Sequence, residues 1–244
     1  MYAFDPCEPF EPPLLPPPVE LETVAVLRKT ASARAALGEF KGSSRQIPNP
    51  AILLDTLSIR EANYSSEIEN IVTTHDQLYR ERLLNTEDRS PAAKEVFRYH
   101  DALFAGVAHV QGAGFLSLNH VLEVQRTLVG NSAGLRTQAG TNLKNGAGEV
   151  VYTPPQDRDL IRRLMDNLVD YLNETEQIAP DPLIRMAVLH YQFETIHPFY
   201  DGNGRTGRIL NMLYLMLQGL LDQPTLYLSR HLIQHKRDYY RLLQ

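Results

Sequence analysis

The sequence has few of the residues that build disulfide frameworks, zinc sites and membrane spans. It contains one cysteine, Cys7, among 244 residues. A single cysteine forms no internal disulfide, and without a CxxC pair it supplies no cysteine zinc site. No run of 18 apolar residues occurs, so we expect no membrane-spanning helix and no membrane partner. The N-terminal residues lack the basic and apolar parts of a signal peptide, and with the lone cysteine this favours a cytoplasmic protein.

Basic residues are also too few for a protein that coats nucleic acid. The 24 lysines and arginines are outnumbered by 29 acidic residues, which leaves a net charge of −5. We therefore expect no direct nucleic-acid site, whereas a local site for a phosphate group stays open. The remaining composition, 43% hydrophobic and 22% charged, is that of a globular protein and excludes wholesale disorder.

The order of residues predicts a proline-rich arm followed by helices. Seven of the 16 prolines lie in residues 1–19, which predicts an extended arm, either on the domain surface or as a mobile tail. Apolar residues then recur with helical spacing. The predicted helices are about 20–37, ending at Gly38, then 49–57, 58–70, 74–84, 92–111, 118–129, 157–174, 182–195, 204–219 and 229–244.

One segment, residues 130–156, breaks the helical pattern. It is rich in glycine, and its Asn145-Gly146 pair is typical of a β-hairpin turn. We therefore expect an all-α fold with one β-hairpin. The N-terminal helical region is expected at 20–90 and the core at 91–244.

The most informative segment is HPFYDGNGRTGR, residues 197–208, which joins two helical patterns. Its GxGxxG spacing matches the dinucleotide-binding fingerprint. That fingerprint requires a preceding strand, and here a helix precedes the glycines. No GK[ST] sequence follows, so the segment is not a Walker A loop either.

The residue types in this loop nevertheless suit a phosphate group. Gly202 and Gly204 let backbone N–H groups approach an anion, and a helix that begins near Gly204 directs its positive end to the same place. Arg205 and Arg208 lie three residues apart on that helix and can bind phosphate oxygens.

Two further side chains of the loop suit phosphate transfer. Asp201 supplies a carboxylate of the kind that Mg²⁺ takes together with substrate phosphates. His197 supplies an imidazole able to exchange protons near neutral pH. A single histidine or glycine-rich turn is more often structural, but all of these features within one loop predict a phosphate-transfer site.

These residues resemble the signature of the Fic family, HPFx[DE]GNGRxxR, and the resemblance extends from about Leu14 to Gln244. The resemblance implies a helical fold, and most members transfer AMP from ATP to a hydroxyl of a target protein, releasing pyrophosphate. The implied partners are ATP with Mg²⁺, a target protein that presents a Ser, Thr or Tyr hydroxyl, and the protein itself by automodification. Homodimers are common in the family.

The resemblance also implies a role for each residue of the loop. His197 would be the general base, Asp201 the Mg²⁺ ligand and Phe199 the buried anchor of the loop. The glycines with Asn203 would hold the α-phosphate, and the arginines would clamp the β- and γ-phosphates. The ATP-binding residues implied in the loop are Gly202, Asn203, Gly204, Arg205, Thr206, Gly207 and Arg208.

A second resemblance lies upstream, where residues 65–70, SSEIEN, fit the family's inhibitory pattern [ST]xxxE[GN]. Ser65, Glu69 and Asn70 occupy its fixed positions. The resemblance implies the class with an N-terminal inhibitory helix, in which Glu69 pairs with Arg208 and removes the clamp for the γ-phosphate. The alternative is a solvated glutamate near a helix end.

The hairpin, residues 138–153, resembles the family's flap, whose edge can add a strand from the target. The alternative is an ordinary surface hairpin. Two adjacent tyrosines near the C-terminus match a pair that the family places near the adenine, although such a pair is more often core. The further nucleotide contacts implied are Val150, Val151, Tyr152, Tyr239 and Tyr240.

Two other functions remain open at this point. In one, the protein removes AMP from a modified protein, with Glu69 orienting a water and His197 protonating the leaving hydroxyl. In the other, the chain is a catalytically silent module that binds a partner. Family members of this class usually continue past the position of Gln244, so the chain is either naturally short or cut within a helix.

Overall fold

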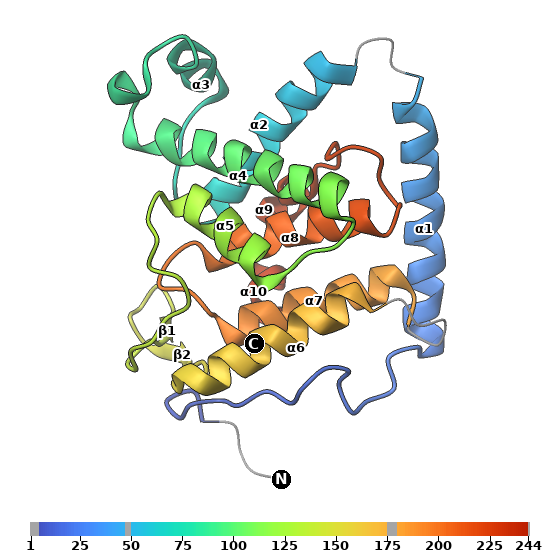
Figure 1. Cartoon of the computed structure of the whole chain (residues 1–244), viewed down its shortest axis with the longest axis vertical. Helices are drawn as coiled ribbons and strands as arrows, with labels where there is room; N and C mark the ends of the chain where they lie inside the picture. Colours follow the sequence, from blue (N-terminus) through green and yellow to red (C-terminus); the bar gives the residue numbers. More distant parts are fainter. Residues whose placement is uncertain (1–4, 47–49, 175–179, 244) are drawn as a thin grey trace.

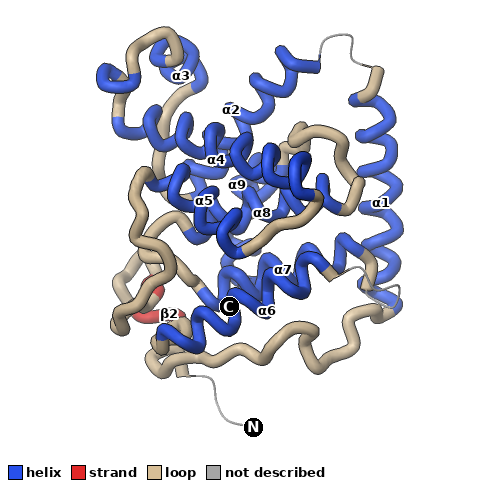
Figure 2. The backbone as a smooth tube through the Cα atoms, in the orientation of Figure 1, coloured by secondary structure: helices blue, strands red, loops and turns tan. Residues whose placement is uncertain are grey.

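The computed structural model describes residues 5–46, 50–174 and 180–243, and over these ranges the chain is mainly helical (Figures 1 and 2). The elements are α1 (Val24–Ser44), α2 (Pro50–Ile68), α3 (His75–Glu81), the 3₁₀ turn η1 (Thr86–Asp88), α4 (Pro91–Ala113), α5 (Leu118–Val129), β1 (Leu143–Lys144), β2 (Val150–Tyr152), α6 (Arg158–Asn173), α7 (Pro182–Ile196), α8 (Asn203–Leu217), α9 (Leu228–Gln234) and α10 (Lys236–Leu243). The predicted all-α fold with one hairpin is confirmed. None of the helices in these ranges combines the length and apolar character that a membrane crossing needs.

Helix α8 lies at the centre of the fold. Its residues 205–210 and 212–216 are all buried. A helix that is buried all round belongs to a core. Helices α4, α5 and α7 pack against it, and Figure 1 shows α8 between the α4–α5 layer and the α6–α7 layer. Because α8 begins within the signature loop, the core fixes the position of that loop.

Local sequence signals set several helix ends as predicted. The Ser90 hydroxyl accepts a hydrogen bond from the Ala93 N–H at 3.3 Å, and Pro91 takes the first position of α4. Gly114 ends α4 with φ 71°, a left-handed conformation that glycine adopts without a Cβ penalty. The Ser117 hydroxyl caps α5 by accepting a hydrogen bond from the His120 N–H.

Two predicted breaks are absent from the N-terminal helices. Helix α1 continues through Gly38 to Ser44. A glycine inside a helix costs only about 1 kcal/mol, and Phe40 beyond it packs on the core. The segments predicted as separate helices at 49–57 and 58–70 form one helix, α2. The Ser58 hydroxyl donates to the Asp55 carbonyl at 3.0 Å within the helix, and Ile59 is buried.

The last predicted helix, 229–244, is divided into α9 and α10 at His235. The backbone of His235 leaves the helical region, with φ −119° and ψ 29°. Its Nδ1 atom lies 2.9 Å from the carbonyl oxygen of His231, so the side chain shares that acceptor with the backbone. The bend turns α10 toward α7.

The hairpin forms where it was predicted, with Leu143 opposite Tyr152 and Lys144 opposite Val150. The described part of the proline-rich arm lies on the domain surface. The Asn167 side chain pairs with both backbone groups of Leu15, at 2.7 and 3.0 Å. Figure 2 shows the arm as a loop that runs beneath α6 to the hairpin.

Candidate functional site

The signature loop is closed by its own asparagine. The Asn203 side chain donates to the Phe199 carbonyl and accepts from the Phe199 N–H, both at 2.8 Å. The Phe199 side chain is fully buried. The loop between α7 and α8 is therefore rigid, and its anchor is the phenylalanine that the resemblance implied.

Two glycines of the loop allow close approaches. Gly202 has φ 80°, and a Cβ there would lie 2.8 Å from Val129. A Cβ on Gly204 would lie 2.3 Å from Oε1 of Glu69 and 3.0 Å from Nη1 of Arg208. The N–H groups in the first turn of α8 have no acceptor within the helix, and its positive end faces this place. The first turn of α8 thus forms an anion cradle, and the Glu69 carboxylate lies over Gly204 within it.

His197 ends α7 in the left-handed conformation, with φ 48° and ψ 59°. Its Nδ1 atom is buried and has no hydrogen-bond partner among the described residues. Burial, with a smaller effect from the Arg136 cation, lowers the pKa of His197 to about 4. The imidazole is therefore neutral at physiological pH and able to accept a proton.

Arg208 is held by the end of α2. Its Nη2 lies 2.8 Å from Glu69 Oε1 and 2.9 Å from the Ser65 carbonyl, and its Nε lies 2.8 Å from the Ser65 hydroxyl. Burial alone would lower the pKa of the guanidinium, but the Glu69 carboxylate raises it above its usual value. Nη1 is buried and has no hydrogen-bond partner in the described part of the chain. The predicted pair is thus formed, and one edge of the guanidinium remains unpaired.

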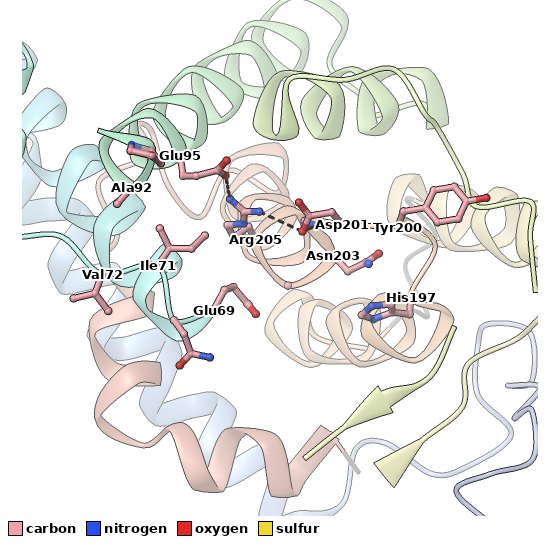
Figure 3. A pocket seen from close by; sticks show the side chains of 14 residues that line it. Glu69, Ile71, Val72, Ala92, Glu95, His197, Tyr200, Asp201, Asn203 and Arg205 are labelled. Atoms are coloured by element: carbon pink, nitrogen blue, oxygen red, sulfur yellow. Dashed lines mark hydrogen bonds and ion pairs between the residues drawn. The ribbon is translucent and has the colours of Figure 1, made fainter. Parts of the chain in front are cut away.

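Arg205 points toward Glu95 and Asp201 (Figure 3). Its Nη1 donates to Glu95 of α4, and its Nη2 lies 3.5 Å from Asp201 Oδ1. The Asp201 side chain is 72% exposed, while that of Arg205 is 3% exposed. Arg205 therefore links the loop to α4 and leaves the Asp201 carboxylate accessible from the adjoining cavity.

Two cavities meet at His197 and Gly204. The first, here called the carboxylate cavity, has a volume of about 630 Å³ and is shown in Figure 3. The second, here called the flap cavity, has a volume of about 570 Å³. The carboxylate cavity is lined by Glu69, Asn70, Ile71, Val72, Pro91, Ala92, Glu95, His197 and Tyr200–Arg205. The flap cavity is lined by Glu69, Asn70, Asn142–Gly146, Val151, Tyr152, Glu194, Thr195, His197, Gly204, Arg208, Lys236, Tyr239, Tyr240 and Leu243.

The residues present fit a magnesium ion bound together with a substrate. The described residues contain no group of three or more His, Cys, Asp or Glu side chains that could hold a metal ion. Mg²⁺ is commonly bound by one or two carboxylates plus substrate phosphates and water, and so does not need such a group. The exposed Asp201 carboxylate at the edge of the anion cradle supplies one such ligand.

The predicted nucleotide contacts differ in where they lie. Val151, Tyr152, Tyr239 and Tyr240 line the flap cavity, whereas Val150 lines neither cavity. Thr206 is fully buried away from both. Gly207 faces α7, where a Cβ would lie 2.6 Å from Glu194. The glycine in this position therefore serves helix packing.

Several residues of the site carry no motif of their own. Glu95 pairs with Arg205, and Lys236 lies 3.1 Å from Asn70 Oδ1. Glu194 lines the flap cavity with Oε1 buried and unpartnered among the described residues, and burial raises its pKa to about 7. In the sequence, the one sign that Glu194 belongs to the site is its position three residues before the signature loop.

The comparisons with family models place this geometry in a family. Residues 27–108 match the Fic/DOC family N-terminal model, and residues 115–215 match the Fic/DOC family model. The second match spans α5 to α8 and includes the whole signature loop.

Named relatives match smaller parts of the chain. A protein adenylyltransferase fic-1 of Caenorhabditis briggsae is 35% identical over 104 residues, which are 43% of this chain and 20% of that protein. A protein adenylyltransferase Fic of Aedes aegypti is 32% identical over 130 residues, 53% of this chain and 24% of that protein. The chain thus aligns with about a fifth to a quarter of the length of these relatives.

Solved structures match over most of the chain. A Fic family protein from Desulfovibrio desulfuricans G20 superposes with a TM-score of 0.71 at 25% identity, covering 93% of this chain and 67% of that one. A Fic domain containing signaling protein from Bacteroides thetaiotaomicron VPI-5482 gives 0.66 at 20% identity, covering 86% and 80%, and shows the fold. With both parts of the chain matched by its models and the signature loop intact, the protein belongs to the Fic/DOC family.

Proposed function

We propose that this protein transfers AMP from ATP to a hydroxyl side chain of a target protein and releases pyrophosphate. The observation that carries the proposal is the arrangement around Gly204. A neutral His197, the positive end of α8 and Arg208 border one space, and a carboxylate occupies that space now. The relatives named above are protein adenylyltransferases, which agrees with this reaction.

In this reaction the chain binds phosphate and moves one proton. The His197 imidazole accepts the proton of the target hydroxyl, and the hydroxyl oxygen forms a bond to the α-phosphorus. The bond from the α-phosphorus to the bridging oxygen of the β-phosphate breaks, and pyrophosphate leaves with that electron pair. The N–H groups at the start of α8 stabilise charge on the α-phosphate oxygens, and Arg208 binds the outer phosphates.

Asp201 would hold Mg²⁺ at the carboxylate cavity in this proposal. When bound, the ion would screen the negative charge of the phosphates. The exposed edge of the hairpin would add a strand of the target and bring its hydroxyl to His197. The chain could present its own hydroxyl groups in the same way, which would give automodification.

The same proposal makes Glu69 an inhibitor of the transfer and assigns the chain to the class with an N-terminal inhibitory helix. Its carboxylate accepts a hydrogen bond from Nη2 of Arg208 and lies over Gly204, where phosphate oxygens would bind. A carboxylate and a phosphate cannot share this space, and like charges repel each other there. ATP would then bind with its γ-phosphate unclamped and its α-phosphate out of line.

The test is the Glu69→Gly variant, incubated with ATP labelled in either the α- or the γ-phosphate. We expect α-label on the variant and on added proteins, at a level roughly 5–150-fold above wild type. This is the usual range for the coupling between an inhibitory contact and a binding site. No γ-label should be transferred, because it leaves in pyrophosphate. The double variant with Arg208→Ala should lose the gain.

A Glu67→Gly variant is the matched control, because it introduces a glycine into the same helix end and keeps the Glu69 carboxylate. Equal labelling of both glycine variants would assign the gain to a loosened α2 and contradict inhibition by Glu69. Transfer of the γ-label would show that the protein phosphorylates its target, and would contradict the proposed adenylyl transfer. Release of AMP from premodified protein by the wild type alone would favour the removal reaction, and no turnover in any variant would favour a silent binding module.

A further inference from the structure

Arg136, in the loop between α5 and the hairpin, is the largest of the fully buried side chains, with 0% exposure. No charged partner of its guanidinium lies within hydrogen-bond distance among the described residues. Instead, Nε donates to the His197 carbonyl at 2.7 Å, and Nη2 donates to the carbonyls of Ile196, at 3.1 Å, and Pro155. A buried cation that binds only backbone carbonyls is an unusual and costly arrangement, which requires an explanation.

The carbonyls bound by this residue are consecutive. The backbone N–H of Arg136 donates to the Pro198 carbonyl at 2.9 Å, so residues 196, 197 and 198 are all held by one residue. The last carbonyls of α7 have no partner within the helix. A cation at a helix C-terminus is also favoured by the helix dipole. Arg136 thus completes the end of α7 at the point where the chain turns.

The turn that it holds is strained. His197 has φ 48°, and the left-handed region is unfavourable for a residue other than glycine, because its Cβ comes too close to the backbone. Such a conformation persists only where the surroundings determine it. The hydrogen bond to the Pro155 carbonyl also ties the end of the hairpin to the same guanidinium. The position of the His197 imidazole relative to the hairpin therefore depends on Arg136.

We propose that Arg136 is a positioning residue, which holds the His197 backbone in its left-handed turn and keeps a positive charge beside the imidazole. The inference rests on the proposed function for its effect on turnover, but the effect on the histidine itself does not. The cation disfavours imidazolium, in agreement with the low pKa of His197. The other titratable and charged groups that line the two cavities with His197 are Glu69, Glu95, Lys144, Tyr152, Glu194, Tyr200, Asp201, Arg205, Arg208, Lys236, Tyr239 and Tyr240.

The test compares two variants of Arg136. Arg136→Gln removes both the positive charge and the planar guanidinium that donates to several carbonyls, whereas Arg136→Lys keeps only the charge. Arg185→Gln is the matched control. Arg185 is also buried and donates to a backbone carbonyl, that of Glu174, but it lies about 18 Å from His197 along α7. Thermal melts of the variants show whether the folds are equally retained.

Turnover is measured in the Glu69→Gly background with α-labelled ATP. We expect kcat to fall by about 10²-fold in Arg136→Gln and Arg136→Lys, since a general base contributes about 10²–10⁴. KM for ATP should change less than about twofold, because the anion cradle is held by Asn203 and α8. Arg185→Gln should keep kcat.

The titration of His197 is measured by NMR on histidine-labelled protein without nucleotide, with its signal assigned from His197→Gln. In the wild type, the His197 imidazole should stay neutral down to about pH 5. In Arg136→Gln its pKa should rise, but it should stay below the ordinary value near 6.5, because burial, the larger cause of the low pKa, remains. Arg136→Lys should keep the low pKa. An unchanged His197 titration in Arg136→Gln, or a kcat loss matched by Arg185→Gln at equal stability, would overturn the proposal. If no variant transfers AMP, the proposed function fails, and the titration still decides this inference.

Discussion

The carboxylate cavity and the flap cavity share four residues, Glu69, Asn70, His197 and Gly204, but their remaining walls differ in chemistry. In the carboxylate cavity, the carboxylates of Glu95 and Asp201 both contact the guanidinium of Arg205. The flap cavity is walled by tyrosines and the hairpin. Among the described residues, Oε1 of Glu194 and Nη1 of Arg208 are buried there without a hydrogen-bond partner.

In the proposed function, this difference would separate two tasks of the site. A cavity with an exposed carboxylate suits a cation and phosphates, whereas aromatic walls with a few polar atoms suit a nucleoside. The anion cradle of α8 lies where the two cavities meet, and Glu69 reaches into both. In the proposed function, this one carboxylate would control both sides at once.

The largest effect is expected at the shared residue His197. The His197→Ala variant, in the Glu69→Gly background, should lose AMP transfer by about 10²–10⁴-fold, because the hydroxyl then lacks a base. ATP binding, measured by calorimetry, should be retained. Gly204→Ala gives the contrast, since its Cβ would enter the cradle and binding should fall. If His197→Ala still transfers AMP, His197 is not the general base. If the variant no longer binds ATP, the role of His197 is structural.

A smaller effect, confined to the carboxylate cavity, is expected at Asp201. Asp201→Asn keeps an acceptor for the Gly202 N–H, now 2.6 Å from Oδ1, but removes the charge. In the Glu69→Gly background we expect turnover at a fixed Mg²⁺ concentration to fall on the order of 10²-fold, with more Mg²⁺ restoring part of it. Glu95→Gln, which breaks the pair with Arg205, is the control and should keep the Mg²⁺ dependence. An unaltered Mg²⁺ titration in Asp201→Asn would exclude Asp201 as the ligand.

The sequence predicted those parts of the site whose residues belong to recognisable motifs. The signature loop is read from contiguous residues, and the Glu69–Arg208 contact followed from pairing two short motifs. Local signals also set the ends of α4 and α5. They failed at Gly38 and His235, where packing of Phe40 and a side-chain hydrogen bond outweighed propensity.

Other parts of the site depend on tertiary contacts that no local pattern encodes. Arg136 lies 61 residues from His197 in sequence, and Glu95 lies 110 from Arg205. A lone arginine in a glycine-rich loop is indistinguishable from a solvated one until the fold buries it. The same reason explains why Thr206 and Gly207, inside the motif, face the core.

The smallest effect is expected in the flap cavity, at Glu194, and it concerns stability. Burial raises the pKa of this carboxyl to about 7 from 4.5, so the folded protein keeps a proton that the unfolded chain releases. Between these pH values the folded state binds more protons, and the free energy of unfolding therefore falls as pH rises through this window. Glu194→Gln has no proton to lose. It should be more stable than wild type at pH 8, by on the order of 2 kcal/mol, and equal to it near pH 4.5. Urea unfolding at both pH values measures the difference, and an advantage that does not change with pH would mean that Glu194 is already ionised in the fold.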